Sequence, residues 1–343
     1  MVQSTRQPIL LGLTEPLRTI VNGKFVRARA NQDLLFSETQ LSVIHSKELD
    51  ITIQLRYCPA LKSKPKQTQH EQTAKKFDPF EDPAPGLLIE RIPPQDHSHN
   101  LVLNKYPVIE NHFIAATKHN KPQSDLLEED DLYATYACLR SWQEDIEDDS
   151  RRALFAFFNS GEHSGASQPH RHLQFLPVEN MISDDEAGWG LLCDSMTFPA
   201  HDGLPLLHNP NLPFIHFATK LGIGMDGRAL SEKYMLLMKA AFATINAGCD
   251  LSNIDKISMS PDKGSAFSYN LAMTTEIMAI LPRKAEAGVI TGTSDGIVFV
   301  NGTVLAGTMM VKSEDDFARL REEPELVQQV LRHITYPVRT TRM

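Results

Sequence analysis

The chain has 343 residues and a formal net charge of -9 at pH 7, with 41% hydrophobic and 22% charged residues, a composition that excludes a disordered protein and a general nucleic-acid coat. Its length exceeds that of a usual single domain, so two lobes or two similar halves are expected. The four cysteines form no Cys-x-x-Cys pair and no run of about eighteen apolar residues occurs, so the sequence predicts neither a zinc knuckle, nor a disulfide framework, nor a membrane span.

The first half of the chain predicts strands, a long loop and then a helix. The clearest strands are 49–57, 101–104 and 113–117, which alternate apolar and polar residues or read as short apolar runs. The basic, proline-rich stretch 58–86 is typical of a surface loop. Helical spacing of apolar residues predicts a helix over 125–149, with Ser124 as its N-cap. His97 and His99 form a His-x-His pair in a turn-rich stretch, where we expect a plain loop.

The second half repeats this order. Residues 212–221 predict a strand, and a helix is expected to start at Ser231 and stop at Gly248. Two further strands follow at 267–275 and 276–283. A last strand pair over 296–311 is expected to turn at Asn301-Gly302, and a helix is expected to start at Ser313. The chain therefore reads as two strand-helix-strand-strand halves.

A cluster of histidines marks the first half. Residues 153–161 form the near-continuous apolar run of a buried strand, and 170–177 read as its partner. On a strand, residues two apart share a face, so His170, His172 and Gln174 project together while Leu173 and Phe175 point to the core. The second half carries no His-x-His.

Three readings of this cluster are open from the residues alone. It can be a structural or solvated histidine cluster, a zinc site, or a nucleophile beside a phosphate-binding loop. A zinc site here would be incomplete, because no cysteine is near and Glu162 is the only adjacent carboxylate. The segment 164–168 offers small residues, backbone N–H groups and two hydroxyls, as phosphate binding requires.

The string NSGEHSGASQPHRHLQFLP, residues 159–177, resembles the active-site signature of the transferase branch of the histidine-triad superfamily, and within it the fungal diadenosine tetraphosphate phosphorylases. LRYCPALKSKP, LNKYPVIENHFIAATK and YNLAMTTEIMAILPR match that family in the same order, so the resemblance spans roughly residues 20–335. Galactose-1-phosphate uridylyltransferases share the motif but typically add zinc-binding cysteines and read His-Pro-His-Gly-Gln. Arg171, Leu173 and the lone Cys58 favour the adenylyl branch, and no metal is implied.

The resemblance implies an α+β fold of two histidine-triad-like halves, each an antiparallel sheet with flanking helices, in a pseudo-dimer. Residues 1–200 would form the catalytic half, and 201–343 a degenerate half that completes the nucleotide site. His172 would be the nucleophile and Gln174 a hydrogen-bond donor to the phosphoryl group, while His170 would order the strand or the phosphate. The implied substrate-binding residues are Lys62, Lys64, Asn104, Lys105, Asn159, Ser164, Gly165, Ala166, Ser167, Gln168, Asn270, Thr274, Thr275 and Arg283.

The implied activity is phosphorolysis of diadenosine tetraphosphate to ADP and ATP through an AMP-histidine intermediate. Adenylyl transfer to sulfate or ADP would be a side activity, and uridylyl transfer between sugar 1-phosphates and a catalytically silent nucleotide sensor are the alternatives. No cofactor is required, although a divalent cation such as Mg can accompany the polyphosphate. The expected partners are diadenosine polyphosphate, orthophosphate, ATP and ADP, without nucleic acid or membrane. We expect a monomer or weak homodimer in the cytoplasm and also the nucleus.

Overall fold

The computed structural model describes residues 11–62, 78–143, 153–182, 188–246, 251–259 and 264–338, with the side chains of residues 61 and 62 excepted. Within these ranges a ten-stranded sheet has the order β3-β4-β5-β7-β6-β11-β12-β10-β9-β8. Its strands are β3 (Leu88–Ile92), β4 (His99–Leu103), β5 (Phe113–Thr117), β6 (Leu154–Ser160), β7 (His172–Pro177), β8 (Phe198–Pro199), β9 (Leu207–His208), β10 (Phe217–Lys220), β11 (Ser268–Met273) and β12 (Ile277–Arg283).

The sheet repeats itself on either side of the β6–β11 pair. Read outward from that pair, β6, β7, β5, β4 and β3 follow the same order as β11, β12, β10, β9 and β8. Neighbouring strands of each half are antiparallel. The prediction of an α+β fold with two similar antiparallel halves is confirmed. The boundary near residue 200 stays a prediction, and β8 and β9, on either side of it, pair with each other.

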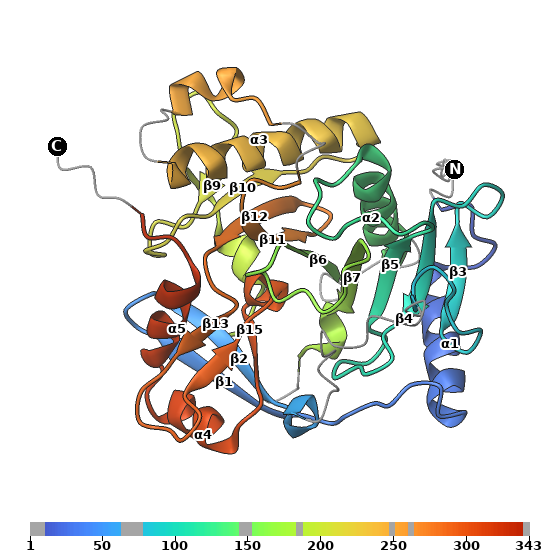
Figure 1. Cartoon of the computed structure of the whole chain (residues 1–343), viewed down its shortest axis with the longest axis horizontal. Helices are drawn as coiled ribbons and strands as arrows, with labels where there is room; N and C mark the ends of the chain where they lie inside the picture. The colour runs from blue at the N-terminus through green and yellow to red at the C-terminus, as the bar shows by residue number, and fades with distance from the viewer. Residues whose placement is uncertain are drawn as a thin grey trace, which may run out of the picture.

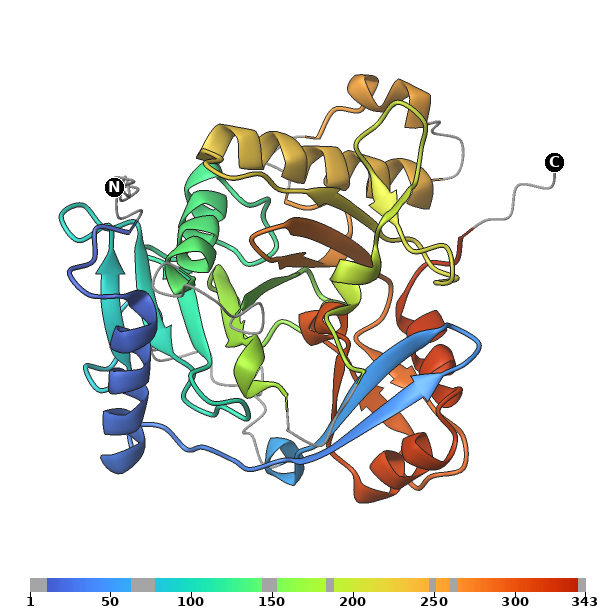
Figure 2. The same ribbon diagram turned by 180° about the vertical axis from the view of Figure 1, so that it is seen from behind.

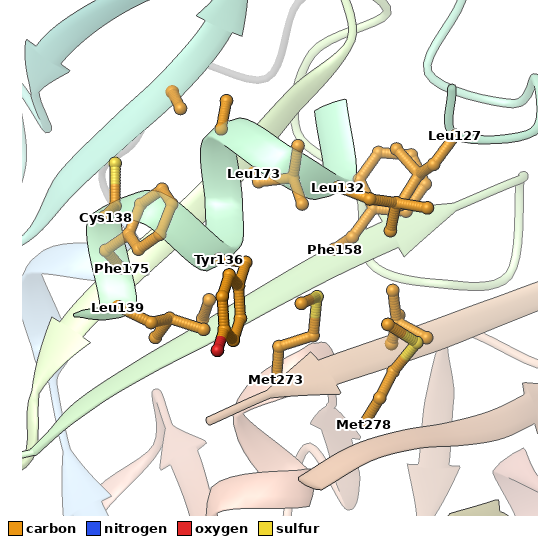
Figure 3. Packing of buried hydrophobic residues seen from close by; sticks show 14 of the residues in the cluster. Leu127, Leu132, Tyr136, Cys138, Leu139, Phe158, Leu173, Phe175, Met273 and Met278 are labelled. Carbon is orange, nitrogen blue, oxygen red and sulfur yellow. The ribbon is translucent and has the colours of Figure 1, made fainter. Parts of the chain in front are cut away.

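Three helices cover one face of the sheet. They are α1 (Leu17–Ala30), α2 (Glu129–Trp142) and α3 (Gly227–Ile245), and Figure 1 shows α2 and α3 packed along the sheet. The core on this face contains Leu173 and Phe175 of β7 together with the stripe Leu132, Tyr136 and Leu139 of α2 (Figure 3). The alternation predicted for β7 therefore holds, since its leucine and phenylalanine face the helices.

The other face of the sheet carries strands from residues 40–57 and elements from residues 287–334. A three-stranded sheet of β1 (Gln40–Ser46), β2 (Ile51–Tyr57) and β15 (Thr308–Val311) lies there with the β13 (Ala287–Val289)–β14 (Ile297–Phe299) hairpin and helices α4 (Glu314–Glu322) and α5 (Leu326–Ile334). Strand β15 runs parallel to β2. Figure 2 shows the long β1–β2 hairpin beside the C-terminal helices. This lobe thus joins residues that lie more than 200 positions apart in the chain.

Both predicted N-caps of the long helices were wrong. Helix α2 starts at Glu129 and is closed by a capping box between Glu128 and Asp131 rather than by Ser124. Helix α3 starts at Gly227, where Asp226 accepts a hydrogen bond from the Ala229 amide at 2.8 Å, so Ser231 lies inside the helix. In both cases a carboxylate a few residues away from the predicted serine takes the role. Gly248, and the predicted continuation of α2 beyond residue 143, lie outside the described residues.

The expected hairpin at Asn301-Gly302 was also wrong. Asn301 instead caps a short 3-10 helix, Gly302–Ala306, by accepting a hydrogen bond from the Thr303 amide at 3.0 Å. Strand β14 pairs with β13, and β15 pairs with β2. A local turn signal cannot distinguish these partners, because the pairing is decided by a strand from the other end of the chain. The predicted helix from Ser313 starts as expected at Glu314 but divides into α4 and α5 around Pro324.

His99 is not in a plain loop, contrary to expectation. It begins β4, is buried, and its Nε2 lies 3.0 Å from an oxygen of buried Asp131. The other oxygen of Asp131 accepts a hydrogen bond at 2.8 Å from Arg171, which also binds Glu128 at 2.9 Å. Burial alone would raise the pKa of Asp131, but the hydrogen bond and charge of His99 and the charge of Arg171 lower it. This cluster ties the start of α2 to β4 and to the residue between His170 and His172.

Candidate active site

A cavity of about 920 Å³ lies on the sheet face opposite the helices. Strand β7 sits between β5 and β6, and its His172 and Gln174 line the cavity while Leu173 and Phe175 are buried in the core. Alternate side chains of β7 therefore face the cavity and the hydrophobic core. The structure brings the two proposed catalytic side chains together at one wall.

His172 is held as a neutral imidazole with one nitrogen available. Its side chain is buried, and Nδ1 lies 2.8 Å from the backbone carbonyl oxygen of His170, an acceptor that fixes the proton on Nδ1. Nε2 is therefore the unprotonated nitrogen. Burial lowers the pKa of His172 to about 4, so the ring is neutral at physiological pH. An unprotonated ring nitrogen on a cavity wall is what a nucleophilic histidine requires.

His170 does not line the cavity but anchors the start of the strand. Its Nδ1 lies 2.8 Å from Oδ2 of Asp78, and its Nε2 lies 2.8 Å from the Thr117 carbonyl oxygen. Burial would raise the pKa of Asp78, but hydrogen bonds from the Phe80 amide and from His170 outweigh it and lower this pKa. Both ring nitrogens of His170 are thus engaged. This geometry suits the ordering role predicted for His170 and leaves attack to His172.

Asp78 and Phe80 were missed because they lie in the stretch read as a surface loop. The Phe80 ring lines the cavity, with its centroid 4.9 Å from that of His172 and 5.7 Å from that of His170. The Phe80 carbonyl accepts a hydrogen bond from Asn100 at 2.9 Å. Proline and acidic residues around them dominate the local pattern, so no sequence signal identifies this wall.

The loop that precedes His170 forms another part of the cavity wall. Gly165, Ala166, Ser167 and Gln168 line the cavity. Gly165 has φ +80°, and a Cβ there would lie 2.9 Å from both the Asn301 Cβ and the Val300 carbonyl oxygen. Only glycine fits this backbone and this approach. Ser164 is buried instead, and its hydroxyl donates to the Gly161 carbonyl at 2.7 Å.

A buried amide network supports this loop from behind. Asn159 Oδ1 accepts hydrogen bonds from the Gly302 amide at 2.8 Å and from Asn270 at 2.9 Å. Asn270 Nδ2 also donates to the Ser164 carbonyl at 2.9 Å, and Arg283 donates to Asn270 Oδ1. Asn159, Asn270 and Arg283 are buried and do not line the cavity. The structure therefore places these three predicted contacts as supports of the loop.

Arg283 brings a buried positive charge close to the loop. Its Nη2 donates to the Val300 and Ala285 carbonyls at 2.9 Å. Burial lowers its pKa to about 9, with Glu286 opposing the shift, so the guanidinium stays charged at neutral pH. A fixed cation beside the loop favours an anion bound there.

Two predicted substrate contacts lie elsewhere. Thr274 and Thr275 follow β11 at its turn into β12, and the Thr274 hydroxyl accepts hydrogen bonds from the Glu276 and Ile277 amides at 3.2 Å. The end of β11 pairs with Ala156, whereas Asn270 pairs with Asn159 nearer the nucleophile. Neither threonine lines the cavity, and a role for them in substrate binding stays a prediction.

The predicted phosphate contacts of the first half are placed in part. Asn104 and Lys105 line the cavity. Lys62 ends a short 3-10 helix, Pro59–Lys62, and its side chain is not among those described. Lys64 lies outside the described residues.

The C-terminal wall of the cavity was missed. It consists of residues that the two small sheets and α4 bring over the first half: Glu286, Asp295, Ile297, Phe299, Val300, Asn301, Thr303, Met309, Met310, Lys312, Ser313 and Asp316. The Lys312 ammonium lies 4.3 Å from the centroid of the Phe299 ring. Strand β15 pairs with β2, Gly302 donates to Asn159 and Val300 accepts from Arg283, and no local pattern predicts these long-range contacts.

Gln123 was missed as well. Its buried carboxamide oxygen accepts a hydrogen bond from the His172 amide at 2.8 Å. Its NH2 group donates to the Asn159 carbonyl at 2.8 Å and to the His172 carbonyl at 3.2 Å. One side chain thus fixes the nucleophile's backbone and joins β6 to β7.

Two negative findings apply to the described residues. They contain no group of three His, Cys, Asp or Glu side chains that could hold a metal ion. Among the described helices none is long and apolar enough to cross a membrane.

Comparison with known protein families gives two consecutive matches. Residues 11–187 match the Ap4A phosphorylase N-terminal domain, where Ap4A denotes diadenosine tetraphosphate. Residues 210–337 match the ATP adenylyltransferase C-terminal domain.

Similar proteins of known identity come from Saccharomyces cerevisiae. Diadenosine 5',5'''-P1,P4-tetraphosphate phosphorylase 2 is 27% identical over 333 residues, which cover 95% of this chain and 96% of that protein. Protein APA1 is 25% identical over 338 residues, with 95% and 96% covered. The crystal structure of yeast Ap4A phosphorylase Apa2 superimposes with a TM-score of 0.76 at 24% identity, covering 96% of this chain and 100% of that one. The complex of the same yeast enzyme with Ap4A gives 0.74 at 23% identity over the same shares. These superpositions show that the fold is shared.

Proposed function

The chain belongs to the Ap4A phosphorylase family, and from that premise we propose that it cleaves diadenosine tetraphosphate with orthophosphate to give ADP and ATP. The observation that carries this proposal is His172, whose Nδ1 is bound to a backbone carbonyl and whose ring lines a cavity beside the Gly165–Gln168 loop. A nucleophile next to close-approaching backbone N–H groups suits a phosphoryl centre.

In the first step, Nε2 of His172 attacks the α-phosphorus of one adenosine. The P–N bond forms as the bond from that phosphorus to the bridging oxygen breaks, and ATP leaves with the bonding electron pair. The imidazole becomes positively charged during attack, and the Nδ1–H bond to the His170 carbonyl strengthens in that state. AMP remains on the protein as a phosphoramidate.

The second step reverses the roles. An oxygen of orthophosphate attacks the same phosphorus, the P–N bond breaks, and its electron pair returns to Nε2. ADP is released and His172 is regenerated. Two displacements at one centre replace one difficult transfer.

Gln174 suits this pair of transfers better than a proton-carrying residue. The terminal phosphate of ATP is a weak base at neutral pH, so its departure needs little acid catalysis. A carboxamide can donate a hydrogen bond to the phosphoryl oxygen but cannot take a proton from water. Phosphate is thereby favoured over water as the acceptor.

The proposed catalytic unit is a single chain. Both halves contribute to the same cavity, since Gln174 comes from the first and Asn301 from the second. A monomer can therefore supply the pairing that small histidine-triad proteins obtain by dimerising. Cytoplasmic and nuclear location, the lack of a required cofactor and the assisting role of a divalent cation stay predictions from the sequence.

Product analysis tests the function. The full-length protein is incubated with Ap4A, with and without orthophosphate, and the nucleotides are separated by chromatography. Equimolar ADP and ATP that form only with phosphate support phosphorolysis. AMP and ATP without phosphate would make the protein a hydrolase, and no turnover of Ap4A would refute the proposal.

A further inference from the structure

His112 lies between two polar residues of the cavity wall and has no role in the two steps above. It precedes β5 and is mostly buried. Its Nε2 lies 3.1 Å from Oε1 of Gln174. On its other side, the Asn104 amide nitrogen lies 3.2 Å from Nδ1 and 3.4 Å from Nε2. The imidazole therefore bridges Asn104 and Gln174.

The hydrogen-bond directions follow from the first member of this chain. The backbone amide of Tyr106, which can only donate, binds Asn104 Oδ1 at 2.9 Å. The Asn104 NH2 group is thus the end that faces His112, and it must donate to an unprotonated ring nitrogen. Nε2 is the nitrogen that faces Gln174, so Nδ1 is the nitrogen that accepts from Asn104. The proton of a neutral ring then resides on Nε2 and is donated to Gln174 Oε1.

We propose that His112 is a positioning residue that fixes the rotation of the Gln174 carboxamide. Because Oε1 is occupied by His112, the NH2 end of Gln174 faces the cavity, where it can donate to an anionic phosphoryl oxygen. A flipped amide would present its oxygen to the phosphate and repel it. The inference rests on the proposed function for the identity of that phosphoryl group. The proposal also requires three successive hydrogen bonds: Tyr106 donates to Asn104, Asn104 donates to His112, and His112 donates to Gln174.

His216 provides a matched comparison within the same chain. It precedes β10, the strand that corresponds to β5 in the repeated sheet order, and it is also buried. Its Nδ1 lies 2.8 Å from the Phe214 carbonyl, and its Nε2 accepts the Asn209 amide at 2.9 Å. Both nitrogens bind backbone groups, and His216 does not line the cavity. The histidine is thus structural in the second half and faces Gln174 in the first.

A double-mutant cycle tests the proposal. The rate of AMP transfer to the protein is measured in single turnovers for the wild type, His112→Phe, Gln174→Ala and the double variant, with His216→Phe as control. We expect His112→Phe to slow transfer about 10- to 100-fold, with less than about a threefold change in the KM for Ap4A, because a donor to the transferred group is lost. The double variant should be no slower than Gln174→Ala. His112→Gln, which keeps an N–H donor, should recover part of the rate.

Two results would overturn the proposal. One is multiplication of the two single effects in the double variant, which would mean that His112 acts independently of Gln174. The other is an equal rate loss in His216→Phe, which would mean that loss of a buried histidine slows the protein whatever its contacts.

A second readout is independent of activity. In protein labelled with ¹⁵N-histidine, long-range ¹H–¹⁵N spectra distinguish the ring tautomers, and His112 is assigned by its disappearance in His112→Phe. We expect its proton on Nε2. A proton on Nδ1 would contradict the proposed relay, that is, the hydrogen bonds from Asn104 to His112 and from His112 to Gln174. If the wild type failed to cleave Ap4A while His112 kept the Nε2 proton, the proposed function would fail and the relay would stand.

Discussion

The Nδ1 atom of His172 lies 2.8 Å from the backbone carbonyl oxygen of His170, two residues earlier in the chain. The His170 ring is in turn held by Asp78 and by the Thr117 carbonyl. A carboxylate, an imidazole and a backbone carbonyl thus orient one nucleophilic nitrogen. The first His of the His-x-His pair acts through its main chain on the second, and its own ring serves as the anchor.

Acid should destabilise the fold through its buried neutral histidines. Burial lowers the pKa of His216 to about 4, and His172 has the same shift. The usual pKa of a histidine in an unfolded chain is about 6.5. Between that pH and about pH 4, these histidines bind protons in the unfolded chain but not in the folded one. Unfolding takes up protons in this window, so the free energy of unfolding falls as the pH decreases.

Urea unfolding at several values between about pH 4.5 and 7.5 measures this effect. Because one titrating group is removed, the slope of unfolding free energy against pH should be smaller in His216→Phe than in the wild type, by up to ~1.4 kcal/mol per pH unit. Above pH 6.5 the two slopes should agree. Equal slopes in the acidic window would show that His216 does not resist protonation.

Gly165→Ala should reduce the cleavage of Ap4A more than it reduces the stability of the fold. The positive φ costs an alanine about 1 kcal/mol, and its Cβ would meet Asn301 and the Val300 carbonyl at 2.9 Å, which displaces the loop. We expect kcat/KM to fall more than about tenfold, since small displacements near reacting groups are costly. Gly203→Ala is the control, because it has a similar φ of +82° and no atom within 4 Å of the added Cβ. Matched losses of activity in both variants would remove the special role of Gly165.

Gln123→Leu should lower both stability and rate. The His172 amide and the Asn159 carbonyl lose their side-chain partner inside the protein, which costs about 1–3 kcal/mol per unsatisfied group. The backbone of the nucleophile is no longer fixed, so single-turnover AMP transfer should slow as well. Urea unfolding and rapid-quench kinetics measure the two effects. A variant that loses stability yet transfers AMP at the wild-type rate would limit Gln123 to a structural role.

Asp78→Ala should slow AMP transfer about tenfold by releasing the His170 ring and the Phe80 wall. The KM for Ap4A should rise too, because the Phe80 ring lines the cavity. Asp82→Ala, an exposed carboxylate of the same loop, is the control and should behave like the wild type. An Asp78→Ala variant with normal kinetics would show that the anchor of His170 is dispensable.

The parts of the fold that local patterns encode were predictable. The apolar run of β6 and the alternation of β7 fix which side chains face the helices and which face the cavity. The starts of the helices were harder to predict, because Glu128 and Asp226 compete with nearby serines as N-caps. Only the three-dimensional path of the chain decides between them. The Asn301-Gly302 pair failed for a similar reason, since β15 finds its partner in β2.

The candidate site divides in the same way. His172, Gln174 and the Gly165–Gln168 loop lie within a few positions of one another, and one sequence stretch contains them. Asp78, His112 and Gln123 act through contacts that span 49 to 92 positions in the chain. A single sequence carries no sign of such contacts, because each of these residues is ordinary in its own neighbourhood. The supporting positions of Asn270 and Arg283 likewise required the sheet register.

Trapping an AMP adduct on His172 tests whether this histidine is the nucleophile. The protein is mixed with a small excess of Ap4A without phosphate, quenched at neutral to alkaline pH because phosphoramidates are acid-labile, and analysed by intact mass and peptide mapping. We predict one AMP on His172, one equivalent of ATP released, and discharge of the adduct as ADP when phosphate is added; His172→Ala should form no adduct and no ADP. Formation of ADP and ATP by His172→Ala at the wild-type rate, or an adduct on another residue that phosphate discharges, would contradict the account.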